Sequence, residues 1–134
     1  MRGDFFDTNV LVYAASSDEL KSARADALLA SGGTISVQVL NEFTNVARGR
    51  MQLDWPPIHN FLAGVRTLMD VCPLDVATHD QALALAEAYK FHLHDALIVA
   101  AALATGCTTL FTEDLHHGLV IDGRLRVLNP FRAD

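Results

Sequence analysis

The stretch HDALIVAAALATG, residues 94–106, constrains the fold more than any other part of the chain. From Ala96 to Ala104 every residue is apolar, so a helix over these residues should be buried on all sides. The segment falls far short of the roughly 20 apolar residues that a membrane-spanning helix needs. Other elements of the same chain therefore have to pack around it.

Short apolar segments with strand character alternate with helical segments along the chain. The expected strands are residues 5–6, 34–37, 71–74, 108–111 and 124–129. Strands that alternate with helices favour right-handed crossovers and a parallel sheet covered by helices on both faces. With 134 residues, the chain is expected to form one α/β domain, residues 1–134, with a central parallel sheet of about five strands.

Composition restricts the classes of partner and the compartment. The net charge of −6 is unusual for a nucleic-acid-binding protein, because lysine and arginine supply most phosphate contacts. Bound metal ions can supply the missing positive charge. No basic leader followed by an apolar stretch opens the sequence, and Cys72 and Cys107 lack the spacing of a metal site. We therefore expect a cytoplasmic protein that does not enter the membrane.

Four acidic residues fall where a parallel α/β sheet places its functional sites, outside the carboxyl ends of the strands. Asp7 directly follows the first strand and Asp114 follows the fourth. Asp95 begins the buried helix that leads into the fourth strand, and Glu42 lies in the helix after the second strand. The topology therefore predicts that all four acids converge on one edge of the sheet.

Each acid also has a structural interpretation when it is considered alone. Asp7 could be a loop residue or a helix cap, Asp95 an N-cap, Glu42 a solvated helix residue and Asp114 a turn residue. These four interpretations leave the shared edge unexplained. Four carboxylates at one edge would repel one another, and oxygen ligands select Mg²⁺ or Mn²⁺ over zinc.

Four segments together resemble a PIN-domain protein, and in particular a VapC-type toxin ribonuclease: FFDTNVLVYA, SVQVLNEF, HDALIVAAAL and LFTEDLHHGLVIDGRLRVLNPF. The resemblance covers essentially the whole chain. It implies a three-layer α/β/α sandwich and Mg²⁺- or Mn²⁺-dependent endonuclease action on RNA. The acidic quartet of the family maps onto Asp7, Glu42, Asp95 and Asp114.

The resemblance also implies supporting residues and partners. Thr8 or Asn9 after the first acid, and Thr112 before the last, match the polar supporting residues of the family. Relatives often carry an aromatic residue before the third acid, where this chain has His94. Relatives are usually toxins that dimerise and are held inactive by an antitoxin. An acidic groove favours a basic peptide, so an antitoxin with a basic tail is expected. The resemblance also implies a homodimer.

The mechanism that we expect is metal-assisted hydrolysis of a phosphodiester bond by an activated water. Asp7, Asp95 and Asp114 are the expected metal ligands, and Glu42 would complete the metal site or orient the water. We expect Thr8 and Asn9 to hold the Asp7 carboxylate through hydrogen bonds.

Arg48, Arg50 and His116 are candidate contacts to RNA. The two arginines also suit the end of a helix, where cations are favourable. The histidines predict no zinc site, because His92 and His94 are two residues apart, and His116 is adjacent to the next histidine.

Two other functions share parts of this pattern. A phosphatase with Asp7 as nucleophile would need a second acid two residues later, where Asn9 stands, and a lysine for phosphate. A non-catalytic RNA- or protein-binding module on the same fold would be expected to lack one or more of the four acids. The nuclease interpretation accounts for all four.

Overall fold

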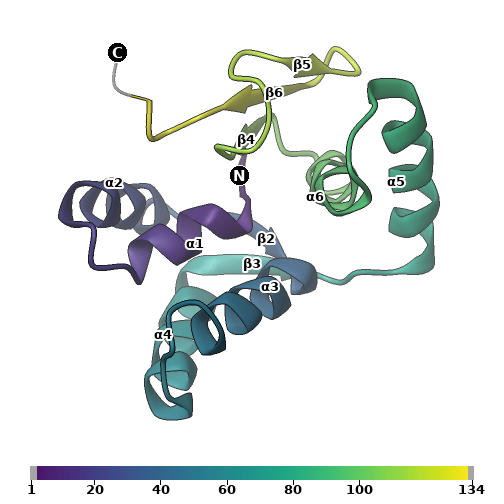
Figure 1. Cartoon of the computed structure of the whole chain (residues 1–134). Coiled ribbons are helices and arrows are strands. Elements are labelled where there is room, and N and C mark those ends of the chain that lie inside the picture. The colour runs from purple at the N-terminus through teal and green to yellow at the C-terminus, as the bar shows by residue number, and fades with distance from the viewer. Residues whose placement is uncertain (1–2, 133–134) are drawn as a thin grey trace.

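A computed structural model of the protein describes residues 3–132 and contains a six-stranded sheet flanked by helices (Figure 1). The predicted domain, residues 1–134, includes two residues at each end that lie outside the described ones. The strands are β1 (Asp4–Phe6), β2 (Gly33–Ser36), β3 (Met69–Cys72), β4 (Thr109–Phe111), β5 (Val120–Ile121) and β6 (Leu125–Leu128). The helices are α1 (Thr8–Ala14), α2 (Glu19–Ala30), α3 (Val37–Arg48), α4 (Trp55–Leu68), α5 (Val76–Tyr89) and α6 (Leu93–Ala104).

The sheet has the strand order β3-β2-β1-β4-β6-β5, and its first five members pair in parallel. The chain moves outward from β1 to β3 through α1–α4 and then returns to β4 through α5 and α6. Right-handed crossovers therefore place α1–α4 on one face of the sheet and α5 and α6 on the other (Figure 1). The expected mainly parallel α/β fold is confirmed.

One strand was not predicted. The two-residue strand β5 pairs antiparallel with β6 at the edge of the sheet. The turn between them places Asp122 and Gly123 in the left-handed region, with φ values of 53° and 66°, and the Arg124 N–H donates to Ile121 O at 3.0 Å. Asp-Gly is a strong signal for a tight hairpin turn. The dipeptide in the sequence was thus the available sign of this strand.

Helix α6 is buried over most of the predicted stretch, although Leu97 is only partly buried and Ala104, its last residue, is exposed. Ala96 and residues 98–103 are buried, and α6 packs closely against α5 and approaches β2. The helix ends at Ala104, and Gly106 follows with a φ of 73°. Among residues 3–132, no helix has both the length and the apolar character needed to cross a membrane.

Gly33 allows β2 to lie close to β1, the strand that carries Asp7 at its end. A Cβ atom at this position would be 2.6 Å from Cε2 of Phe6 and 2.8 Å from the backbone oxygen of Asp4. Phe6 is fully buried, and its ring stacks on Phe111 with centroids 5.5 Å apart, so it has little room to move. The close approach of β2 to β1 at this point therefore requires a residue without a side chain.

We expect Gly33→Ala to lower the free energy of unfolding by about 1–3 kcal/mol, since the added methyl overpacks a filled region. Gly64→Ala is the matched control, because a Cβ at that position in α4 meets nothing within 4 Å. It should be neutral or should stabilise by about 0.5–1 kcal/mol, as alanine favours a helix over glycine. Urea denaturation of both variants measures this difference, and equal effects would contradict the packing argument.

Candidate active site

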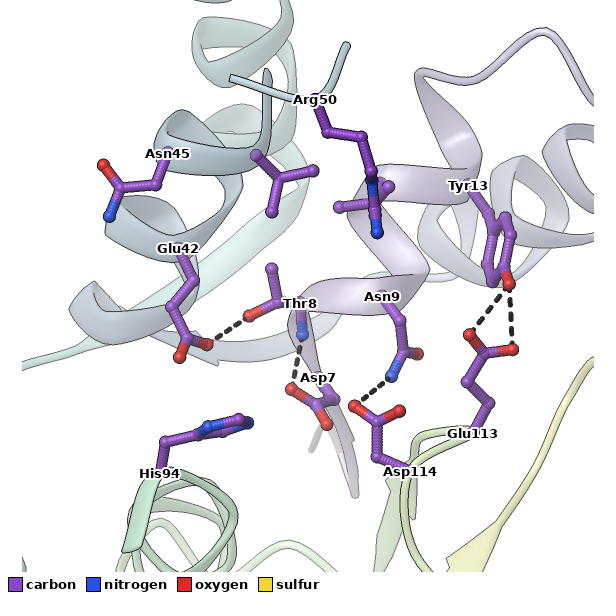
Figure 2. A pocket seen from close by; sticks show the side chains of 12 residues that line it. Asp7, Thr8, Asn9, Tyr13, Glu42, Asn45, Arg50, His94, Glu113 and Asp114 are labelled. Carbon is purple, nitrogen blue, oxygen red and sulfur yellow. Dashed lines mark hydrogen bonds between the residues drawn. The ribbon is translucent and has the colours of Figure 1, made fainter. Parts of the chain in front are cut away.

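A cleft of about 510 Å³ opens where the strands β1 and β4 end (Figure 2). Asp7, Glu42 and Asp114 line it, and they come from the end of β1, from α3 and from the loop after β4. Asp95 does not line the cleft directly. One ligand atom from each of His94, Asp95 and Asp114 lies within 4.8 Å of the others, so Asp95 adjoins the same site.

Asp7 is both the N-cap of α1 and a member of this cleft. The residue is only 3% exposed, and its backbone N–H extends the sheet by donating to Phe111 O at 3.0 Å. Its Oδ1 accepts from the Thr8 N–H at 2.7 Å, and its Oδ2 accepts from the Thr112 hydroxyl at 2.7 Å. The helix-cap interpretation of Asp7 is therefore correct, and it coexists with a place in the cleft.

Burial makes the charge of Asp7 costly. Desolvation raises the pKa of Asp7 to about 6, although the hydrogen bonds from Thr112 and Thr8 lower it. The nearby carboxylates of Asp114 and Asp95 raise the pKa further by repulsion. Asp7 thus carries a negative charge at neutral pH that its surroundings only partly stabilise.

Thr112 connects the first acid to the last. Its hydroxyl is fully buried and donates to Asp7 Oδ2, while it accepts from Asn9 Nδ2 at 3.2 Å and from the Asp114 N–H at 3.0 Å. One donor and two acceptor positions are all that a hydroxyl offers, so Thr112 is saturated. It fixes the loop after β4 against α1.

Thr8 and Asn9 have different partners from those expected. The Thr8 hydroxyl donates to Glu42 Oε1 at 2.7 Å, and Asn9 Nδ2 donates to Asp114 Oδ2 at 3.2 Å (Figure 2). Thr8 and Asn9 are the first two residues of α1, so their side chains leave the helix in different directions. Neither side chain holds Asp7: that contact comes from Thr112 and from the backbone of Thr8.

Gln38 is a site residue that sequence reasoning missed. It is 7% exposed, and its Nε2 donates to the backbone oxygen of His94 at 3.1 Å and to Glu42 Oε2 at 3.4 Å. It therefore joins α3 to the start of α6. It also contacts Oε2 of Glu42, whereas Thr8 contacts the other carboxylate oxygen. The available signal was its spacing, four residues before Glu42 on the same helix face.

Asp95 is the third residue of α6, and the N-cap of that helix is His92, so the N-cap interpretation of Asp95 is wrong. Asp95 is 8% exposed, and its Oδ1 is buried without a hydrogen bond from the described residues. His94 Nε2 lies 3.1 Å away from this oxygen. Burial raises the pKa of Asp95, His94 and His92 lower it, and the acids Asp114 and Glu42 raise it.

The predicted RNA contacts differ in where they lie. Arg50 lines the cleft, and Figure 2 shows its side chain extending toward Asn9. Arg48, the last residue of α3, does not line it. Its Nη1 donates to Leu53 O at 3.1 Å, and its guanidinium lies 4.7 Å from the centre of the Trp55 ring. His116 is exposed in the loop after β4 and does not line the cleft.

A second acidic side chain enters the cleft beside Asp114. Both carboxylate oxygens of Glu113 accept from the Tyr13 hydroxyl, at 2.8 and 3.0 Å, and Lys21 Nζ donates to that hydroxyl at 3.2 Å. The contact joins residues 100 apart in the chain, so no local sequence pattern predicts it. Together with Thr112, it ties the loop that carries Asp114 to α1.

The arrangement suits a divalent cation. The donors are carboxylate oxygens with one imidazole, and one buried oxygen of Asp95 has no hydrogen bond from the described residues. A buried carboxylate oxygen without a hydrogen bond is costly, and a cation would compensate it. Among the described residues, Arg50 is the only lysine or arginine that lines the cleft, so side chains alone offer little positive charge.

We expect Thr112→Val to raise the pKa of Asp7 above its value of about 6, because the variant removes a hydrogen bond that stabilises the charged form. It should also destabilise the protein by about 1–3 kcal/mol, since the buried Asp7 carboxylate loses a hydrogen bond and the Asp114 N–H loses this acceptor. Thr112→Ser keeps the hydroxyl and should leave the pKa of Asp7 close to 6. Carbon-13 NMR titration of the carboxyl group measures the pKa, and equal values in both variants would contradict the role of Thr112.

The raised pKa of Asp7 also predicts how stability depends on pH. The group has an ordinary pKa of 3.8 when unfolded and about 6 when folded, so folding favours the protonated form. Its contribution is fully present below pH 3.8 and is lost as the pH rises through 6. Relative to Asp7→Asn in EDTA, the wild type should lose about 2 kcal/mol of unfolding free energy between pH 4 and pH 7.5. Denaturant unfolding across this range measures the difference, and a constant difference would be the contrary result.

Comparisons with known proteins agree with this fold. A toxin–antitoxin complex from Klebsiella pneumoniae contains a chain that is 22% identical, with a TM-score of 0.72 over 97% of this chain and 99% of that chain. The toxin VapC20 of Mycobacterium tuberculosis, described as cleaving the sarcin–ricin loop, is 20% identical, with a TM-score of 0.66 over 83% and 91% of the two chains. VapBC2 from Rickettsia felis, bound to a fragment of promoter DNA, is 19% identical, with a TM-score of 0.64 over 92% and 96%.

Sequence comparisons give two results. No curated protein sequence matches significantly. The PIN domain family, by contrast, matches over residues 5–119, a range that contains all four predicted acids. Since this match spans most of the chain, the protein belongs to the PIN domain family.

Proposed function

We propose that the protein is a metal-dependent endoribonuclease, and that it is the toxin of a toxin–antitoxin pair. The observation that carries the proposal is the meeting of four acids from four separate segments around a cleft with a single arginine in its described lining. Membership of the PIN domain family and the toxins among the structurally similar proteins support it. The likeness to VapC20, which is described as a toxin that cleaves the sarcin–ricin loop, supports RNA as the substrate class.

In this proposal, Asp7, Asp95 and Asp114 hold Mg²⁺ or Mn²⁺. Such a cation, when bound, polarises a phosphoryl oxygen and lowers the pKa of a bound water. The carboxylates must be ionised for this role, and burial of Asp7 makes its ionised form depend on a nearby positive charge. Proton release from Asp7 would therefore accompany cation binding.

The remaining residues of the site orient these groups. Thr112 and Asn9 hold Asp7 and Asp114 in fixed directions through the hydrogen bonds described above. Thr8 and Gln38 hold the two oxygens of Glu42, which lines the cleft. In this proposal, Glu42 would orient the attacking water or accept its proton. Arg50, which also lines the cleft, would contact a phosphate of the RNA chain.

The partners follow from charge and from the similar structures. A net charge of −6 and an acidic cleft complement a basic peptide, so we propose an antitoxin whose basic tail occupies the cleft. The similarity to chains in toxin–antitoxin complexes supports such a partner. We further propose a single domain over residues 1–134 that acts in the cytoplasm as a homodimer.

We expect purified wild-type protein to cut RNA at discrete places in Mg²⁺ or Mn²⁺ and to lose this activity in EDTA. Asp7→Asn and Asp114→Asn should each lower the rate by at least about 100-fold, because even the loss of a group that supports a metal ligand costs 10–100-fold. Asp26→Asn is the matched control, since this acid is exposed on α2 and away from the cleft.

Gel analysis of a defined RNA, with circular dichroism to verify folding of each variant, measures these effects. Cleavage that persists in EDTA, or that is equal in wild type and Asp7→Asn, would contradict the proposed function.

A further inference from the structure

We propose that His94 is a direct nitrogen ligand of the cation site and that its imidazole makes the site prefer Mn²⁺ over Mg²⁺. The inference rests on the proposed function, because it concerns the same cation that Asp95 and Asp114 are proposed to hold. The acidic quartet alone would present only oxygen to the cation. His94 changes the chemistry of the donor set.

His94 lies beside the carboxylates of the proposed cation site. It is the second residue of α6, it lines the cleft, and Figure 2 shows its ring extending from α6 toward Asp7. Its backbone oxygen accepts from Gln38 Nε2 at 3.1 Å, which fixes the first turn of α6 against α3. The side chain is 58% exposed, so the ring can turn without displacing packed neighbours.

The separations among the candidate ligand atoms fit a shared cation. His94 Nε2 lies 3.1 Å from Asp95 Oδ1, and one ligand atom each of His94, Asp95 and Asp114 lies within 4.8 Å of the others. Bonds of about 2.1 Å place two opposite ligands of one ion about 4.2 Å apart. A small rotation of the exposed ring and of the Asp114 carboxylate therefore brings the three atoms to coordination distance.

Asp95 supplies an independent sign of a ligand. The residue is more than nine-tenths buried, and its Oδ1 has no hydrogen bond from the described residues. The imidazole faces this oxygen at 3.1 Å without the geometry of a hydrogen bond. A cation held between the nitrogen and the oxygen would satisfy both atoms. The competing arrangement is a direct ion pair between a protonated His94 and Asp95.

The two arrangements differ in metal preference. Mg²⁺ is a hard ion that favours oxygen ligands and keeps its waters. Mn²⁺ also favours oxygen, but it is the first ion of the Irving–Williams series of transition metals, which bind mixed nitrogen and oxygen sites, so it accepts an imidazole more readily than Mg²⁺ does. A ligating imidazole should therefore favour Mn²⁺ selectively. A protonated His94 would repel either ion to a similar extent and give no preference.

The experiment measures the dissociation constants of Mn²⁺ and Mg²⁺ by isothermal titration calorimetry at one pH. The proteins are the wild type, His94→Gln and the control His92→Gln. His92 is exposed, lies two residues earlier on the same helix end and does not line the cleft. We expect His94→Gln to weaken Mn²⁺ binding by about tenfold or more and Mg²⁺ binding by less than about threefold. His92→Gln should match the wild type for both ions.

Pulsed electron paramagnetic resonance of bound Mn²⁺ gives a direct signature. Strong coupling to an imidazole nitrogen-14 should be present in the wild type and in His92→Gln, and absent in His94→Gln. An unchanged ratio of Mn²⁺ to Mg²⁺ affinity in His94→Gln, equal weakening of both ions, or no nitrogen coupling in the wild type would overturn the role of His94 while leaving the proposed function standing. A wild type that binds neither ion would overturn both.

Discussion

The buried carboxylate of Asp7 is the constraint on which the rest of the site depends. The chain ends its central strand β1 in a charge that is 3% exposed, and burial raises the pKa of that group to about 6. The fold offers it two hydrogen bonds, from the Thr8 backbone and the Thr112 hydroxyl, and two repelling neighbours, Asp95 and Asp114. The ionised form of a carboxylate held in this way is unfavourable, and a bound cation can stabilise it.

The polar groups around Asp7 form a connected frame and not a set of separate contacts. Thr112 joins Asp7 to Asn9 and to the loop of Asp114, so hydrogen bonds connect α1 to the segment after β4. On the other side, Gln38 links α3 to the start of α6, where His94 and Asp95 lie. Four segments distant in the chain are thereby held at one edge of the sheet.

The sequence predicts the arrangement of strands and helices better than it predicts the hydrogen bonds within the site. Apolar periodicity and the alternation of elements identify the parallel sheet and the buried helix α6, and topology then brings the strand-end acids to a common edge. The hydrogen-bond partners do not follow in the same way, because Thr8 reaches Glu42 and Asn9 reaches Asp114 only through the position of α1 beside α3 and the loop after β4. The hydrogen bond from Gln38 to the backbone of His94 likewise depends on how α3 lies against α6. The two residues are far apart in the chain, so no local sequence pattern predicts this contact.

The central claim is that the charge of Asp7 is tolerated because a cation compensates it. Carbon-13 NMR titration of the Asp7 carboxyl group, with and without saturating Mg²⁺, tests this most directly, since Mg²⁺ is diamagnetic and leaves the signal visible. We predict a midpoint near 6 without the ion and a fall to below about 4 when Mg²⁺ is present. A midpoint that stays near 6 in both conditions, or one that lies at the ordinary value of 3.8 in both, would contradict it.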